Sequence, residues 1–367
     1  MPERQRIPEI VGTGFVALDV VINGLRPQGP RLWAGGTCGN VLAISGFLGW
    51  RPSAIARLSD DPAGQCVLDD LKRWNVDVCY AQLEPQCPTP IVVQEITKTK
   101  SGIPVHRFLW TCPGCGAYYP GFRPVTINAV RAIQPKMRDA SVFFFDRVSP
   151  GILDIARYYA RKGSLIFFEP SGGGDPRLFQ EALRLTHVLK YSHQRVRSFT
   201  DLLTKSFPPL QIETLGEDGL RFRCNLPGMS SAGWRLMGSF EVPAFKDSAG
   251  SGDWCSAGII SAIGANGVEG LSSLSLDDLT RALRFGQALA AWNCGFEGAR
   301  GGMYAVAKSA FKKSVARILA GRTSKHLTML PNNEGYEEDL SLLCPNCELP
   351  TTTRAKSQTR SVLLLQK

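Results

Sequence analysis

The chain has 367 residues, of which 44% are apolar, and this length and composition predict a globular protein with a sizeable core. No stretch approaches the roughly 20 consecutive apolar residues of a membrane-spanning helix, and the charged start MPERQRIPEI lacks the apolar run of a secretory signal. We therefore predict a cytoplasmic protein without a membrane partner. Half of the net charge of +10 lies in residues 308–367. Because aromatic residues do not interleave with this basic segment, a solvated tail is favoured over a nucleic-acid surface.

The hydrophobic pattern alternates between strands and helices along most of the chain. In chain order, strands are predicted at 9–22, 53–59, 89–97, 103–110, 140–149, 164–174 and on both sides of a glycine turn within 210–224. Helices are predicted at 39–50, 63–76, 151–163, 253–264, 276–293 and 303–319. Such alternation predicts an α/β fold in which helices cover both faces of a mostly parallel sheet. In sheets of this kind, ligands bind beyond the carboxyl ends of the strands.

Two parts of the chain do not fit this alternation. Short strands within 14–33 and 89–110 predict a small antiparallel flap beside the main sheet. Periodicity ends near residue 320, which predicts a main domain over 1–320 and a tail or small appended element over 321–367.

The segment DSAGSGD (247–253) is a glycine-rich turn directly ahead of an apolar helix. Glycines at 250 and 252 allow backbone N–H groups to converge on one point, and the positive end of the helix dipole adds to them. This arrangement is an anion hole suited to a transferring phosphoryl group, and Asp253 beside it can accept a proton from an attacking hydroxyl. The alternative is a plain glycine turn in which Asp253 only caps the helix.

Several segments, in register with DSAGSGD, resemble the ribokinase-like (PfkB-type) carbohydrate kinases. They are GFVALDV, which contains Asp19, then GGTCGNVL, ARLSDDPAG, TLGEDG and ALRFGQALAAWNCGFEGARGGM. The family's late signature is an aspartate, a small hydroxyl residue, any residue and then Gly-Ala-Gly-Asp, and here Ser251 replaces the alanine. The resemblance runs from about residue 9 to about 318 and implies the three-layer ribokinase-like fold with a flap.

The resemblance also implies an activity, namely the Mg²⁺-dependent transfer of the γ-phosphoryl group of ATP to a hydroxyl of a sugar or nucleoside. It makes Asp253 the general base and assigns the anion hole to Gly250, Ser251 and Gly252. It assigns acceptor binding to Asp19, Gly35, Gly36 and Asn40, ATP contacts to Thr214, Gly216, Gly219 and Gln287, and a monovalent-cation loop, found in some members, to Asp247. Structural roles remain alternatives for all of these except Asp253. A homodimer is a further expectation, because flap strands in this family often pair between subunits.

The chain departs from the family at one functional element. An Asn-x-x-Glu sequence linked to Mg²⁺ and phosphate usually follows a strand in the second half, and here LKYSHQRV (189–196) places Ser192 and Arg195 at those positions. An arginine can contact phosphate directly, and Glu169 in FFEP is expected near the metal. A catalytically weak or inactive kinase fold that serves as a ligand sensor or scaffold is therefore the alternative function.

Two Cys-Pro-x-Cys turns contain Cys112 with Cys115 and Cys344 with Cys347. Each turn directs two thiolates at one point, so the two together predict a tetrahedral structural Zn²⁺ site. Because the pairs are far apart in sequence, the tail must fold back onto the flap region. The alternatives are unpaired thiols or a redox pair.

Overall fold

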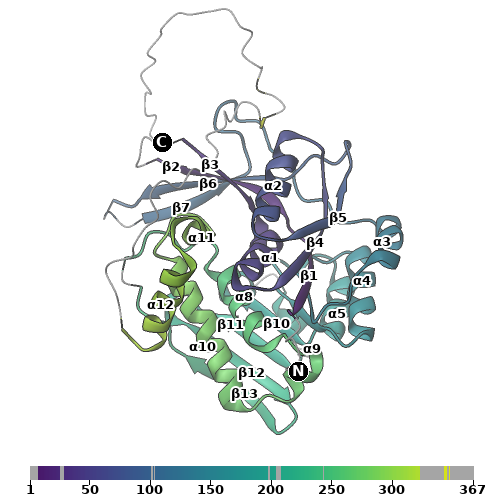
Figure 1. The fold of residues 1–367 in the computed structure, drawn as a ribbon, viewed down its shortest axis with the longest axis vertical. Coiled ribbons are helices and arrows are strands. Elements are labelled where there is room, and N and C mark those ends of the chain that lie inside the picture. Colours follow the sequence, from purple (N-terminus) through teal and green to yellow (C-terminus); the bar gives the residue numbers. More distant parts are fainter. Residues whose placement is uncertain are drawn as a thin grey trace, which may run out of the picture.

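The computed structural model describes residues 7–24, 29–100, 102, 104–196, 199–203, 208–242 and 244–322, together with Leu343, Cys344 and Cys347. These residues form two sheets, one of nine strands and one of four, with helices packed around the larger sheet (Figure 1). The predicted boundary between a main domain and a tail at residue 320 stays a prediction, because most of 321–367 lies outside the described residues.

The nine-stranded sheet has the order β13-β12-β11-β10-β9-β8-β1-β4-β5. Strands β11 through β5 in that order run parallel, and β12 and β13 add an antiparallel edge. The strands are β1 (Glu9–Thr13), β4 (Arg51–Leu58), β5 (Asp77–Leu83), β8 (Val142–Phe145), β9 (Leu165–Phe168), β10 (Val188–Ser192), β11 (Leu210–Thr214), β12 (Leu220–Leu226) and β13 (Met229–Met237). This topology confirms the predicted mostly parallel sheet.

Helices cover both faces of this sheet because its central strands are apolar on both sides. Phe144 and Phe167 pack in one core, while Phe143, Phe145 and Phe168 pack in the other. The first face carries α1 (Gly36–Leu48), α2 (Pro62–Arg73), α8 (Ser251–Ile263), α10 (Leu276–Asn293), α11 (Gly301–Ala305) and α12 (Lys308–Leu319). The second carries α3 (Ile127–Ile133), α4 (Pro150–Arg161), α5 (Pro176–Leu185) and α7 (Thr200–Leu203). The short helices α6 (His193–Val196) and α9 (Gly267–Ser272) complete the three layers.

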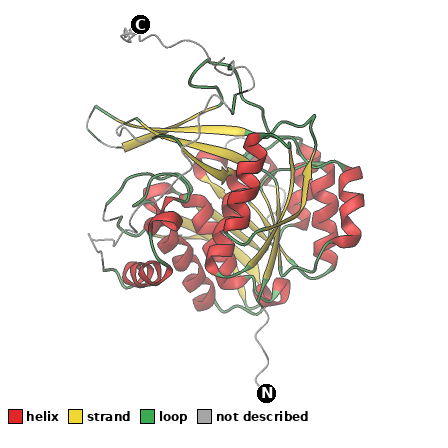
Figure 2. Cartoon of the chain, turned by 45° about the horizontal axis from the view of Figure 1, so that its top comes forward, coloured by secondary structure: helices red, strands yellow, loops and turns green. Residues whose placement is uncertain are grey.

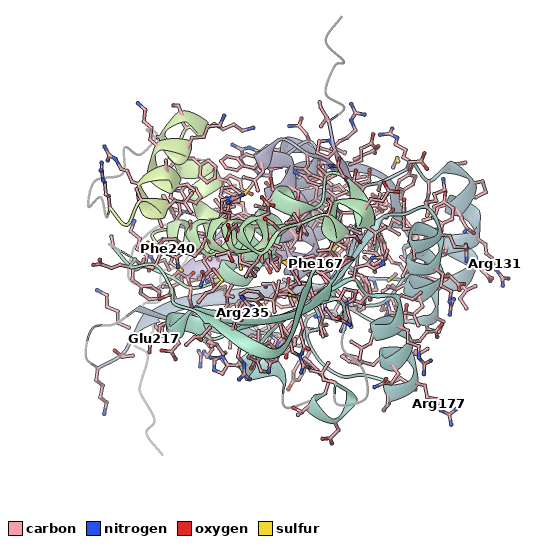
Figure 3. All side chains as sticks on the ribbon, turned by 90° about the horizontal axis from the view of Figure 1, so that it is seen from below. Arg131, Phe167, Arg177, Glu217, Arg235 and Phe240 are labelled. Atoms are coloured by element: carbon pink, nitrogen blue, oxygen red, sulfur yellow. The ribbon has the colours of Figure 1, made fainter. Side chains whose placement is uncertain are left out.

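The view from below separates interior from surface side chains. Phe167 lies within the molecule, whereas Arg131 and Arg177 project from its outer edge (Figure 3). Among the described residues, no helix is both long and apolar enough to cross a membrane.

The flap is the four-stranded sheet, with the order β3-β2-β6-β7. Its strands lie apart from the helix-covered main sheet (Figure 2). The flap consists of β2 (Ala17–Asn23), β3 (Arg31–Gly35), β6 (Ile91–Lys98) and β7 (Pro104–Leu109). The predicted location is confirmed. The pairings β2–β3 and β6–β7 are antiparallel as expected, whereas β2–β6 is parallel and joins the two hairpins.

The prediction of one strand over 9–22 is wrong, because the segment divides between the two sheets. Gly14 has a φ of +134° between β1 and β2, and a side chain there would overlap the carboxylate of Asp146. Asp146 follows β8, is buried, and accepts a hydrogen bond from the backbone N–H of Phe15 at 2.8 Å. The apolar run therefore bends at Gly14 and passes from the main sheet into the flap.

Other boundaries differ in smaller ways. The predicted helix over 303–319 is two helices, α11 and α12, because Val306 between them adopts an extended conformation. Helix α8 begins two residues before the predicted start at 253. The elements that were not predicted individually are β3, β5, β10, β13, α3, α5 and the short helices α6, α7 and α9.

Candidate active site

Helix α8 begins at the predicted glycine turn. Gly250 precedes the helix with a φ of +71°, and a side chain there would overlap the carbonyl oxygen of Ala299. The N–H of Ser251 donates to the carbonyl of Ser248 at 3.1 Å, so one of the three expected anion-hole donors is already engaged. The amides of Gly252 and Asp253 lie in the first turn, where a helix offers its own N–H groups no acceptor. Free amides of this kind, together with the positive end of the helix dipole, are the features with which helix N-termini bind anions, so the anion hole stays a prediction for this turn.

We expect replacement of Gly250 by Ala to destabilise the protein by about 2–4 kcal/mol, since the change adds left-handed strain and an overlap with a carbonyl. The matched control is Gly163→Ala, at a φ of +79° with no atom within 4 Å of the added carbon, where about 1–2 kcal/mol of strain alone is expected. Urea unfolding of both variants measures the difference. Equal losses would contradict close packing at Gly250.

Asp253 lies in the first turn of α8, facing α1 across the site. The side-chain amide of Asn40 donates to its Oδ2 at 2.7 Å, which fixes the orientation of the carboxylate. Burial, and to a smaller extent the charge of Glu169, raises the pKa of Asp253 to about 8, although Asn40, Lys190 and Arg195 act in the opposite direction. A carboxylate with a raised pKa beside an anion-binding helix end is well suited to accept a proton.

A buried ion pair between Lys190 and Glu169, which the sequence did not predict, contacts the glycine turn. Nζ of Lys190 donates to Oε1 of Glu169 at 2.7 Å and to the carbonyl of Gly252 at 3.0 Å. The hydroxyl of Ser256 donates to the other carboxylate oxygen of Glu169. Glu169 therefore anchors Lys190 instead of lying open to a metal as expected. The signal in the sequence was a lysine among the apolar residues of the segment that forms β10.

Asp19 and the Gly35–Gly36 turn lie on the flap side of the site. A side chain on Gly35 would overlap the Asp19 carboxylate, and Gly36 at a φ of +74° begins α1. Burial raises the pKa of Asp19 to about 7, against the lowering effects of Arg300 and of the Gly36 N–H. The structure thus brings Asp19, both glycines and Asn40 together, as the resemblance implied.

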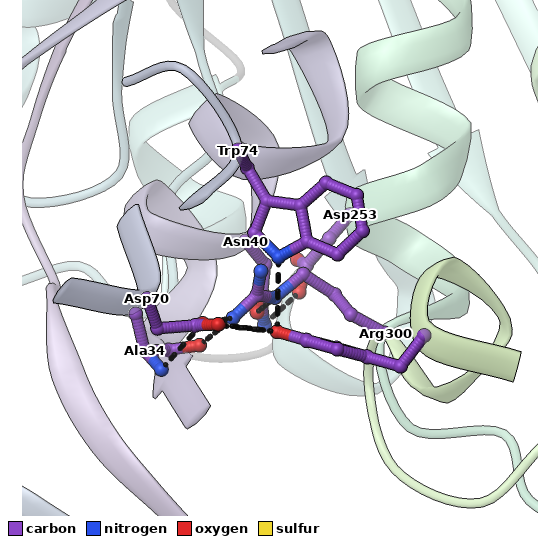
Figure 4. A network of polar contacts seen from close by, with 7 residues as sticks. Ala34, Asn40, Asp70, Trp74, Asp253 and Arg300 are labelled. Carbon is purple, nitrogen blue, oxygen red and sulfur yellow. Dashed lines mark hydrogen bonds and ion pairs between the residues drawn. The ribbon is translucent and has the colours of Figure 1, made fainter. Parts of the chain in front are cut away.

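Arg300 joins these residues in a network that the sequence did not reveal (Figure 4). Only 1% of its surface is exposed, and its Nε donates to Oδ1 of Asn40 at 3.0 Å. Its Nη2 donates to Asp70 at 2.6 Å and to the carbonyl of Ala34. The hydroxyl of Tyr304 donates to the same carboxylate at 2.9 Å. Arg300 therefore holds Asn40, which in turn holds Asp253.

The expected ATP-side residues lie along β11 and the turn that follows it. Thr214 ends β11, and Gly216 and Gly219 have φ values of +68° and +98° in the turn. Gln287 lies on α10, where its amide donates to the carbonyls of Met237 at 3.4 Å and Gly238 at 3.2 Å. This bond holds α10 against the end of β13, so an adenine contact by Gln287 stays a prediction.

Asp247 connects the glycine-rich segment to the flap. Gln94 of β6 and the backbone N–H of Gly298 donate to its Oδ2, and His106 of β7 lies 2.8 Å from its Oδ1. The N–H of Ala249 also donates to Oδ1, at 2.9 Å. Because both oxygens have protein partners, Asp247 serves here to attach the flap, and the monovalent-cation prediction for this loop stays untested.

The four cysteines of the two Cys-Pro-x-Cys turns are brought together, as expected. Their sulfur atoms all lie within 4.8 Å of one another. Their cluster forms a potential metal site separate from the residues around Asp253.

Comparison of the fold with solved structures identifies sugar and nucleoside kinases. The aminoimidazole riboside kinase from Salmonella enterica, complexed with aminoimidazole riboside and an ATP analog, aligns with a TM-score of 0.61 at 17% identity, over 84% of this chain and 99% of its own. A Burkholderia thailandensis nucleoside kinase in complex with inosine gives 0.61 at 17% identity, over 85% and 99%. A Xylella fastidiosa fructokinase with bound ATP gives 0.60 at 16%, over 79% and 93%.

In sequence comparisons, the chain matches no protein-family model and no curated protein. The structural alignments nevertheless span most of the chain and confirm that it has the ribokinase-like fold.

Proposed function

We propose that this protein transfers the γ-phosphoryl group of ATP to a hydroxyl of a sugar or nucleoside. The observation that carries the proposal is the half-buried carboxylate of Asp253, which lies in the first turn of α8 and is fixed by Asn40. The fold supports it, because the kinases named above were solved with a riboside, inosine or ATP.

In this proposal, the acceptor hydroxyl lies beside Asp253 and is held by Asp19, Asn40 and the Gly35–Gly36 turn. Asp253 removes the hydroxyl proton as the oxygen attacks the γ-phosphorus in line. The amides and dipole of α8 stabilise the charge on the transferring group, since they are fixed before the reaction begins. The ion pair of Lys190 with Glu169 beneath the turn offsets part of the negative charge that the phosphates would meet there.

ATP would bring Mg²⁺, which neutralises phosphate charge when bound. The chain departs from the family's metal element at Ser192 and Arg195, and Glu169 is engaged with Lys190 and Ser256. Mg²⁺ retains several waters and takes few protein ligands, so phosphate oxygens would supply most of its coordination, with Asp253 as the nearby carboxylate. We propose that Arg195 contacts the phosphates, because its positive charge lowers the pKa of Asp253 from the exposed side of the site.

A pH profile is expected to report the titration of Asp253. The base must be deprotonated, and burial raises its pKa to about 8 in the free protein. We therefore expect kcat/KM to rise by up to about tenfold per pH unit between about pH 6 and 8 and then to level off. Steady-state rates at saturating ATP measure it. A flat profile over this range would contradict Asp253 as the base.

A panel of pentoses, hexoses, their monophosphates and nucleosides, each with ATP and Mg²⁺, tests the function itself through ADP release and thermal shift. Turnover with one acceptor class supports the kinase. Thermal stabilisation by ATP or a sugar without any turnover would support the sensor or scaffold alternative, which the replacements Ser192 and Arg195 favour.

A further inference from the structure

The four sulfur atoms of Cys112, Cys115, Cys344 and Cys347 have the spacing of a metal tetrahedron. Cys112 and Cys347 lie 3.7 Å apart, Cys115 and Cys344 lie 3.5 Å apart, and all four sulfurs fall within 4.8 Å of one another. Zinc–sulfur bonds of about 2.3 Å at tetrahedral angles place sulfurs about 3.8 Å apart. Disulfide sulfurs are about 2.05 Å apart, so neither pair is bonded.

The backbone around each pair is folded to present sulfurs in one direction. Thr111 and Tyr118 form an antiparallel bridge that closes the first turn, and the N–H of Gly116 donates to the carbonyl of Cys112 at 2.9 Å. The N–H of Cys347 donates to the carbonyl of Cys344 at 3.1 Å and closes the second turn. Both turns are formed by local hydrogen bonds, and the two pairs meet although they are 229 or more residues apart.

We propose that these four cysteines bind one structural Zn²⁺ that fastens the C-terminal segment to the chain beside the flap. Four thiolates are the soft ligand set that selects zinc, and they fill its coordination shell, so the ion has no open position for catalysis. Within the described chain, no other group of three or more His, Cys, Asp or Glu side chains converges in this way.

A metal at this site would also explain why Leu343 and Cys344 are buried. Leu343 and Cys344 are 5% and 4% exposed and belong to the same apolar core as Cys112 and Tyr119. A metal bond to Cys344 and Cys347 would hold Leu343 in this core, although it is far in sequence from Cys112 and its tethering would otherwise cost entropy.

Aromatic residues on both sides of the first cysteine turn contact Phe15, which in turn contacts the start of α1, where the proposed acceptor-binding residues lie. The rings of Trp110 and Phe122, on either side of the turn, each lie 6.1 Å from the ring of Phe15. The carbonyl of Phe15 accepts the N–H groups of Cys38 at 3.1 Å and Gly39 at 3.4 Å in the first turn of α1. Zinc would therefore order 110–122 and support the turn that carries Gly36 and Asn40. This consequence rests on the proposed kinase function, whereas zinc binding does not.

The first experiment measures metal in the purified full-length protein. About one zinc per chain is expected in wild type, less than about a tenth of that in Cys347→Ser, and retention in Cys347→His, which keeps a four-ligand shell. Cys79→Ser is the control, because Cys79 is exposed and outside the cluster. Cobalt substitution should give tetrahedral d–d bands and thiolate charge-transfer bands. Metal-free protein in which the thiols of all four cluster cysteines react with a thiol reagent, or a Cys112–Cys347 disulfide, would overturn the proposal.

A second measurement tests whether zinc orders residues 110–122, and it does not depend on kinase activity. Hydrogen exchange should increase at least severalfold across 110–122 in Cys347→Ser relative to Cys347→His and stay unchanged in α4. If the kinase is active, the acceptor KM should rise more than the ATP KM. Unchanged exchange across 110–122 would show that zinc does not support the acceptor-binding residues. If no kinase activity is found, the zinc content still tests whether the four cysteines bind the metal.

Discussion

Asp253→Asn is expected to lower kcat by about 10²–10⁴-fold while leaving the KM for ATP unchanged or slightly lower. The asparagine has nearly the same shape and can still accept the hydrogen bond from Asn40, so the site keeps its geometry. It cannot take up the acceptor proton, and it removes a negative charge near the phosphates. Initial rates of ADP formation, with calorimetric ATP binding alongside, measure both effects.

Two controls keep this result interpretable. Asp154→Asn, which removes a carboxylate from the exposed side of α4, should leave kcat unchanged. The stability of Asp253→Asn should exceed that of wild type at about pH 8 and by a smaller margin at about pH 5. The folded pKa of Asp253 is raised from 3.8 to about 8, so wild type loses stability as pH rises through this interval, and the asparagine does not. A kcat near the wild-type value would contradict the assigned role.

Arg300→Met is expected to cost about 3–5 kcal/mol of folding stability, the largest effect of any single substitution considered. The change leaves the carboxylate of Asp70 buried without its cation and removes the donor that holds Asn40. Because Arg300 positions Asn40 and through it Asp253, the acceptor KM should rise and kcat should fall in whatever protein remains folded. Urea unfolding at neutral pH measures the stability change.

A matched pair of variants compares the loss of a buried ion pair with the loss of an exposed one. Arg51→Met removes the partner of Glu9 in an ion pair whose arginine side chain is 52% exposed, and less than about 1 kcal/mol is expected. The double variant Arg300→Met with Asp70→Asn should recover part of the loss, because the uncompensated charge is gone. Equal effects at Arg51 and Arg300, or no recovery in the double variant, would show that the buried network contributes little.

The sequence predicted those parts of the site that are formed by residues close together in the chain. DSAGSGD predicted the start of α8 to within two residues, because a glycine-rich turn directly ahead of an apolar run is typical of a helix start, and Asp253 lies in the first turn of that helix. The Cys-Pro-x-Cys turns predicted their own meeting in the same way, since the spacing within each pair fixes two sulfurs together. The alternation of strands and helices predicted the parallel sheet.

The remaining features depend on contacts between distant segments. Arg300 lies in a glycine-rich turn near the end of the resemblance, and nothing local indicates that it reaches Asp70 and Asn40. The apolar run 9–22 contains no polar break strong enough to signal a change of sheet, which Gly14 and the distant Asp146 impose. The contacts of Asp247 with Gln94 and His106 were not predicted, because these residues come from flap strands whose register no local pattern fixes.

The most direct test of the central claim follows the labelled γ-phosphoryl group of ATP in the presence of the acceptor panel, with wild type and Asp253→Asn side by side. We predict that wild type places the label on a hydroxyl of one sugar or nucleoside class and that Asp253→Asn does so at least about 100-fold more slowly. Label that stays on ATP with every acceptor, or equal transfer by the two proteins, would contradict a kinase in which Asp253 is the base.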